Sequence, residues 1–101
     1  DASLAHAVLN EANLQYAVLF RANLTNITAE RTILTEASMR GANLSGAVLR
    51  FSDFFAADLS DADLTGADFS VAFLLSAILL NANQTGTIFA GALMPDNTVH
   101  P

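Results

Sequence analysis

An apolar side chain recurs every five residues along almost the whole chain. Fifteen of the nineteen positions in this series, which runs from Leu4 to Met94, are Leu or Phe. A second series lies two residues before the first, and fifteen of its nineteen members, from Ala2 to Ala92, are Ala. Any fold of this chain must therefore send two side chains inward in every five residues.

A five-residue period fits neither common regular structure. A helix advances about 100° per residue, so steps of five residues spread the leucines around the whole cylinder. A strand alternates with a period of two, so an odd repeat sends successive leucines to opposite faces. The pattern instead requires the chain to turn once every five residues, which excludes an amphipathic helix.

Asn or Asp often stands between the Ala and the Leu or Phe of each repeat. Runs such as 57–61, 62–66 and 67–69 read Ala-Asp-Leu or Ala-Asp-Phe followed by small or polar residues. This A(D/N)LXX motif resembles the pentapeptide-repeat proteins, and the C-terminal residues resemble the tails of cyanobacterial or plastid members. The resemblance implies an all-β fold, a right-handed quadrilateral parallel β-helix of four to five coils. We expect the β-helix over residues 1–94 and a C-terminal tail or cap over 95–101.

A coil of twenty residues predicts which side chains stack on one another. Phe69 and Phe89 should stack inside the core, as aromatic neighbours favour. Thr32 and Ser52 differ by twenty, so their inward hydroxyls should lie one above the other, where they could share a hydrogen bond. On the surface the same spacing predicts two charge pairs between coils, Glu11 with Arg31 and Glu30 with Arg50.

The charge balance and the motifs exclude several classes of function. The formal net charge is −6, from ten acidic residues against four arginines and no lysine, which disfavours direct binding to nucleic-acid phosphates. The chain has no cysteine, no apolar run near the ~20 residues needed to span a bilayer, and no catalytic or phosphate-binding motif. We therefore expect no enzyme activity, no cofactor, no metal site and no small-molecule substrate.

Acidic residues gather in the C-terminal half of the chain at one repeat position. On the expected fold they ring one coil and point away from one another, so they do not converge on a metal. One interpretation is that these carboxylates accept hydrogen bonds from backbone N–H groups at the turns. The other is an acidic surface presented to a basic partner. The residues are Asp53, Asp58, Asp63 and Asp68, with Asp61 at a corner.

Large apolar residues occupy outward positions in the same half, where polar residues stand elsewhere. A contiguous exposed apolar patch often marks an interface. Three occupants are possible, namely the folded-back C-terminal tail, a second copy of the chain, or a partner protein. The residues map to one side and its adjoining corner, Phe51, Phe55, Val71, Phe73, Leu75 and Leu93, with Ile78 and Leu80 on the next side.

These observations predict a non-catalytic solenoid that serves as a protein-interaction or scaffold surface. The resemblance offers an alternative, because some longer relatives imitate B-form DNA and bind type II topoisomerases such as gyrase. It also implies the cytoplasm or the thylakoid lumen of a cyanobacterium or plastid as the location. The chain begins at Asp1 already in repeat register, so we expect it to be a fragment or a processed product.

Overall fold

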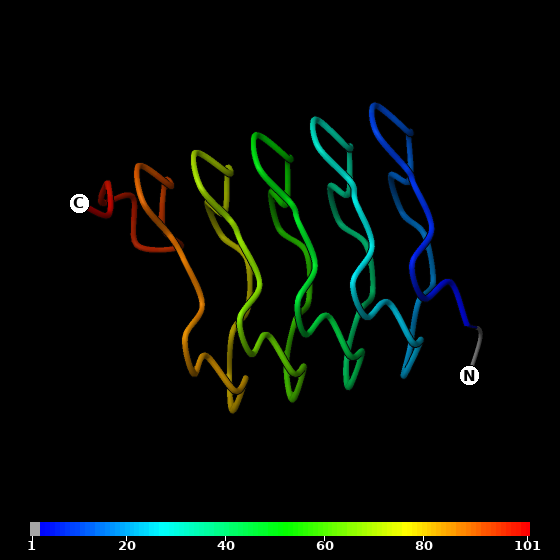
Figure 1. Ribbon diagram of the computed structural model, residues 1–101. Coiled ribbons are helices and arrows are strands. Elements are labelled where there is room, and N and C mark those ends of the chain that lie inside the picture. The colour runs from blue at the N-terminus through cyan, green and yellow to red at the C-terminus, as the bar shows by residue number, and fades with distance from the viewer. Residues whose placement is uncertain (1–2) are drawn as a thin grey trace.

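The chain winds into a stack of four-sided coils. A computed structural model describes residues 3–101 and shows the coils following one another from the N-terminal to the C-terminal end (Figure 1). Bridged residues lie twenty positions apart, so each coil takes four pentapeptides. Residues 3–82 form four coils, and the residues after them begin a fifth. The predicted right-handed quadrilateral β-helix is confirmed.

The β-structure of residues 3–101 consists of parallel bridges one residue long on each side of the coil and one antiparallel bridge at the C-terminal tail. This part of the chain contains no helix. Each side therefore has one column of bridged residues. The four columns are Ser3, Asn23, Asn43, Asp63 and Asn83; Val8, Thr28, Val48, Asp68 and Ile88; Asn13, Ile33, Asp53, Phe73 and Leu93; and Val18, Ser38, Asp58 and Ile78.

Tight turns join the sides at the corners. In the first, the Ala7 N–H donates to the Leu4 carbonyl oxygen at 3.0 Å, and His6 between them has a φ of 65°. A positive φ at the third turn residue is the signature of a type II turn. The pattern recurs every five residues as far as Gly91, and most of these corners hold a residue other than glycine. The five-residue period is thus a period of turns.

The core is a narrow column of the inward Leu, Phe and Ala side chains. Leu44, Leu64 and their neighbours in the central coils are fully buried, and burying a side chain of this size contributes about 1.5–3 kcal/mol. Leu9 and Leu14 in the first coil are only partly buried. Each coil is therefore covered chiefly by its neighbours, as in other solenoids.

Three phenylalanine rings lie in contact through the C-terminal part of this core, and two of them are stacked. Phe69 lies 5.2 Å from Phe54 and 5.5 Å from Phe89, measured between ring centroids. The planes of Phe69 and Phe89 are 24° apart. The predicted stacking of Phe69 on Phe89 is confirmed.

The predicted hydrogen bond between Thr32 and Ser52 is wrong. The Thr32 hydroxyl donates to the Leu9 carbonyl oxygen at 2.9 Å, and the Ser52 hydroxyl donates to the Leu49 carbonyl oxygen. Both side chains are buried. A backbone carbonyl at the corner lies within reach of each hydroxyl, so each bonds to the backbone and not to the other.

One pentapeptide departs from the repeat without breaking the coil. Ile27 occupies an inward Ala position and Ala29 an inward Leu position, and both are buried. The change roughly conserves core volume, which packed interiors tolerate best. The corner adjusts slightly, because the Ile27 N–H lies 3.4 Å from the Leu24 carbonyl oxygen, against 3.0 Å at the first corner.

The C-terminal tail turns back along the last coil. Val99 forms an antiparallel bridge with Leu93, and the Met94 N–H donates to the Thr98 carbonyl oxygen at 2.7 Å. The His100 ring lies 5.9 Å from the Phe89 ring. The tail thus satisfies part of the last coil's backbone and shields one end of the aromatic stack. The division of the chain after residue 94 stays a prediction.

Candidate functional site

The large outward apolar residues gather around one side of the solenoid. We call the column Asn13, Ile33, Asp53, Phe73 and Leu93 the Phe73 face. Phe55 lies at a corner of this face and is 39% exposed, while Phe73 is 37% exposed. Their ring centroids are 6.3 Å apart. The two rings therefore form an exposed aromatic pair.

Phe51 and Val71 occupy the opposite corner of the same face. They adopt φ values of 60° and 57° and are 43% and 48% exposed. A left-handed conformation costs about 1–2 kcal/mol for an L-residue, and a β-branched residue is rare there. Two large apolar side chains are thus held outside the core at corner positions that suit glycine or asparagine. The same positive φ recurs at the other corners of the coils, so the backbone conformation here follows the fold, and the apolar side chains set these two corners apart.

The remaining predicted members of the patch lie at its edges. Leu75 lies at the same corner as Phe55, one coil further toward the C-terminus, and is half-buried. Ile78 and Leu80 are exposed on the next side. Leu93 is half-buried and pairs with Val99 of the tail. The tail therefore contacts the C-terminal margin, while the other members named above stay exposed or half-buried. We call these eight residues the apolar wall: Phe51, Phe55, Val71, Phe73, Leu75, Ile78, Leu80 and Leu93.

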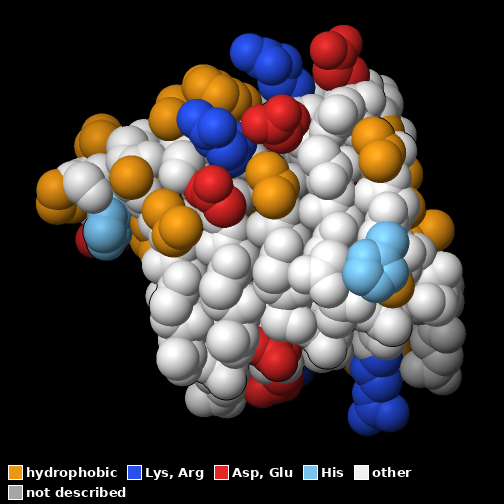
Figure 2. Space-filling model, in the orientation of Figure 1, with side chains coloured by type: hydrophobic (Ala, Val, Ile, Leu, Met, Phe, Trp, Pro, Cys, Tyr) orange, Lys and Arg blue, Asp and Glu red, His pale blue; other side chains and the backbone are white. Residues whose placement is uncertain are grey.

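Two arginines border the apolar wall, a feature that the sequence analysis did not find. The Arg31 guanidinium carbon lies 5.0 Å from the Phe51 ring centroid, and that of Arg50 lies 5.6 Å from it. Figure 2 shows basic side chains directly beside hydrophobic ones along one edge of the solenoid. One aromatic ring thus holds two cations by cation–π contact.

The predicted pairs of these arginines with Glu11 and Glu30 are wrong. Among residues 3–101, the ion pairs all involve Arg40. Arg31 and Arg50 approach Phe51 instead. Arg31 lies between Glu11 in the preceding coil and Phe51 in the following coil, and its guanidinium contacts the Phe51 ring.

The acidic residues of the third and fourth coils bond mainly to their own turns. The Asp53 carboxylate accepts the Phe55 N–H, and the Asp68 carboxylate accepts the Ser70 N–H and hydroxyl. The Asp63 carboxylate accepts the Thr65 N–H at 3.0 Å and the Thr65 hydroxyl. These bonds hold the pKa of Asp63 below its usual value.

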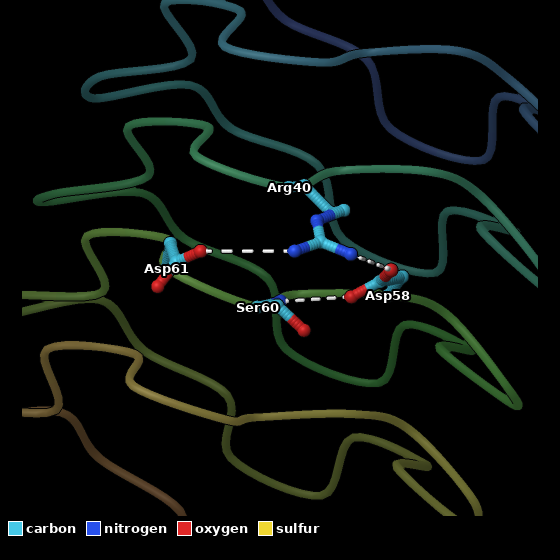
Figure 3. A network of polar contacts seen from close by, with 4 residues as sticks. All are labelled: Arg40, Asp58, Ser60 and Asp61. Carbon is cyan, nitrogen blue, oxygen red and sulfur yellow. Dashed lines mark hydrogen bonds and ion pairs between the residues drawn. The ribbon is translucent and has the colours of Figure 1, made fainter.

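Arg40 joins two further carboxylates on the outside of the solenoid. Its guanidinium nitrogens lie 3.9 Å from a carboxylate oxygen of Asp58 and 3.9 Å from one of Asp61 (Figure 3). Burial raises the pKa of Asp58, but the hydrogen bonds from Ser60 and the charge of Arg40 outweigh burial and hold that pKa below its usual value. The acidic surface thus contains its own cation.

The described part of the chain shows little that could enclose a ligand. Residues 3–101 form no pocket, and their His, Asp and Glu side chains include no group of three that could hold a metal ion. The same residues contain no helix that could span a membrane. The features that remain for recognition lie on the outer surface.

The chain belongs to the pentapeptide-repeat family. The family profile described as Pentapeptide repeats matches residues 1–26 and 32–70 in 8 copies. The gap between the two ranges contains the off-pattern Ile27 and Ala29. Among curated proteins, none matches the chain.

Solved structures of other pentapeptide repeat proteins share this fold. HetL of the cyanobacterium Nostoc sp. strain PCC 7120, involved in heterocyst differentiation regulation, is 35% identical, with a TM-score of 0.56 over 98% of this chain and 56% of that chain. A pentapeptide repeat protein from the Arabidopsis thaliana thylakoid lumen is 25% identical, with a TM-score of 0.71 over 90% of this chain and 60% of that chain.

A third neighbour shows the fold alone. QnrB1, a plasmid-mediated fluoroquinolone resistance protein, is 16% identical to this chain, with a TM-score of 0.66 over 85% of this chain and 48% of that chain. The chain thus spans about half to three-fifths of the length of the three structures.

Proposed function

We propose that this chain is a non-catalytic scaffold whose apolar wall binds a protein. The observation that carries the proposal is the exposure of Phe51 and Val71, two large apolar side chains that follow one another at one corner of the Phe73 face. A positive φ is common to the corners of this fold, so it is the exposed apolar side chains that distinguish these two positions. Neither side chain is buried by this chain. A partner that covers the apolar wall would supply the burial, at about 25 cal/mol per Å² of apolar surface.

The exposed pair of Phe55 and Phe73 supports the same conclusion. Aromatic side chains dominate the energetics of protein interfaces. The pair lies between Phe51 and Val71 at one corner and the next side of the solenoid, so the apolar surface is continuous around a corner. Its partner is a second protein or a second copy of this chain.

The test compares Phe55→Ser/Phe73→Ser with the wild type by analytical ultracentrifugation over a range of concentrations. If copies associate through the wall, the wild type sediments as a larger species and the variant as a monomer. If the partner is another protein, affinity capture with the wild type retains it and the variant does not. The proposal fails if the two proteins sediment alike and no partner is lost.

A matched control separates loss of the wall from loss of apolar surface in general. Val8 and Val18 are exposed apolar residues of the first coil, away from the wall. The variant Val8→Ser/Val18→Ser should sediment and capture partners like the wild type. The melting temperatures of both double variants are measured as well. A variant that stays folded at the temperature of the binding assay shows that lost binding is not caused by unfolding.

Imitation of DNA toward a type II topoisomerase has less support. The carboxylates that would imitate phosphates already accept hydrogen bonds at their turns, and Asp58 and Asp61 share Arg40. A DNA supercoiling assay with gyrase and excess protein tests this alternative, which fails if supercoiling is unchanged. For the location, we propose the thylakoid lumen or the cytoplasm, the former supported by the Arabidopsis neighbour.

A further inference from the structure

We propose that the partner of the apolar wall is an acidic protein segment whose carboxylates bind Arg31 and Arg50 while its apolar side chains pack on Phe55 and Phe73. This inference rests on the proposed function and adds the chemistry of the partner. Its basis is the distribution of the four arginines, two of which stand at the edge of the wall.

The arginines of the chain differ in what they contact. Arg40 is neutralised by Asp58 and Asp61, and Arg21 stacks on Phe20 at 5.1 Å. Arg31 and Arg50 form no ion pair within residues 3–101, although the net charge is −6. Two cations are thus held at one phenyl ring without an ion pair of their own within residues 3–101.

Their contact with Phe51 leaves the guanidinium groups able to bind an anion. A guanidinium that lies on an aromatic face keeps its N–H donors at the edge of its plane, where a carboxylate can accept two of them. One ring brings both cations to the same corner of the Phe73 face. A segment with carboxylates at this corner is attracted to them, whereas a basic segment is repelled.

The spacing across the face suits a short extended segment. Phe51 and Phe55 occupy the two corners of one coil, four residues apart. At about 3.3 Å per residue, an extended segment of about four residues reaches from the arginines to the aromatic pair. Acidic residues at one end and apolar residues at the other would match the face.

An anionic membrane is the competing occupant, and the charges disfavour it. Each basic residue near an anionic surface contributes about 1 kcal/mol, and only Arg31 and Arg50 stand at the wall. The ten acidic residues of the chain, among them Asp53 on the Phe73 face, would be repelled by the same surface. A protein segment can place its charges selectively, which a lipid surface does not.

The test uses fluorescein-labelled synthetic peptides of about eight residues with alternating Leu and Asp, and matched peptides in which Asp is replaced by Asn or by Lys. Fluorescence anisotropy at low salt should show the Asp peptide binding more tightly than the Asn peptide, and the Lys peptide binding least. Arg31→Gln/Arg50→Gln should weaken binding of the Asp peptide roughly 3- to 30-fold, which corresponds to two exposed charge pairs. It should leave the Asn peptide unchanged. The control Arg21→Gln should have no effect, and salt should remove the preference for Asp.

The outcomes separate this inference from the proposed function. One outcome is that the Asp and Asn peptides bind equally well, with binding lost in Phe55→Ser/Phe73→Ser. That result would support binding by the apolar wall and overturn the role of the arginines. Failure of the Asp peptide to bind at millimolar concentration overturns the inference, and the sedimentation and capture experiments then decide the proposed function alone. Binding to vesicles containing phosphatidylserine that requires Arg31 and Arg50 would also overturn it.

Discussion

The Thr32 hydroxyl donates a hydrogen bond to the carbonyl oxygen of Leu9, 2.9 Å away in the preceding coil. This hydrogen bond connects two coils through a buried side chain, whereas most hydrogen bonds between coils connect backbone to backbone. The same carbonyl also accepts the Ala12 N–H at 3.0 Å, so it keeps a partner when the hydroxyl is removed.

Replacing Thr32 by Val should therefore cost about 0.5–1.5 kcal/mol, the net contribution of one hydrogen bond. The free energy of unfolding is measured by urea denaturation. Thr25→Val is the control, because the Thr25 hydroxyl bonds to exposed Asn23, and it should cost less than about 0.5 kcal/mol. Equal losses in the two variants would contradict the structural role of Thr32.

Gly46→Ala should be more destabilising than Gly66→Ala. Both glycines have positive φ values, 69° and 66°, so each alanine pays the left-handed penalty of about 1–2 kcal/mol. A Cβ at Gly46 would also collide with Oδ1 of exposed Asn26, so that side chain must move, whereas a Cβ at Gly66 meets nothing within 4 Å. Thermal unfolding in an Asn26→Ala background checks this, since the difference between the two glycines should then disappear.

Truncation of a core leucine should lower the free energy of unfolding more in the middle of the solenoid than at its N-terminal end. Leu64 is fully buried, so Leu64→Ala should cost about 2–5 kcal/mol. Leu14 is only partly buried, so Leu14→Ala should fall at or below the lower limit. Urea denaturation gives both values, and a larger loss at Leu14 would show that a further coil covers it in solution.

Acid should destabilise the chain partly through Asp63. Its pKa is lower in the folded chain than its usual value, so the ionised form stabilises the fold at and above the unfolded value near 3.9. This contribution is lost as the pH falls from about 5 through 3.9 toward the lower folded pKa. Asp63→Asn should flatten that part of the stability curve while still folding, since asparagine stands in the same column at residues 43 and 83. An unchanged acid profile, followed by circular dichroism, would contradict the assignment.

Removal of residues 95–101 should leave a folded but less stable solenoid. The tail supplies the acceptors for the Gly91 and Met94 N–H groups, and His100 lies against Phe89. We expect a lower melting temperature and faster hydrogen exchange at those two amides, with the central coils unchanged. Global unfolding of the truncated chain would show that the tail is an integral part of the domain.

The repeat was enough to predict a turn every five residues because its information is local and repeated, and the resemblance to pentapeptide-repeat proteins implied four such turns in each coil. Every pentapeptide carries the same inward pair and the same turn, so one departure, such as Ile27 with Ala29, leaves the register readable. The twenty-residue spacing then predicted the stacking of Phe69 on Phe89, because inward rings are confined to the narrow core.

The twenty-residue spacing did not predict the contact where a side chain could reach more than one partner. Thr32 was expected to bond to Ser52, and its hydroxyl donates to the Leu9 backbone carbonyl instead. Arg31 could extend toward Glu11 in the coil before or Phe51 in the coil after, and it extends toward Phe51. Spacing predicts which residues are neighbours, but the direction of a long or polar side chain depends on the acceptors around it.

The twenty-residue coil also limits how such a chain can change in length. Five residues inserted after Asn43 would rotate everything downstream by a quarter turn, so Phe51 would no longer lie beside Arg31, although every pentapeptide would still fit the core. An insertion of twenty residues would keep all the sides aligned and still separate the two by one coil. Duplications and deletions can therefore preserve the solenoid while erasing a surface that spans two coils.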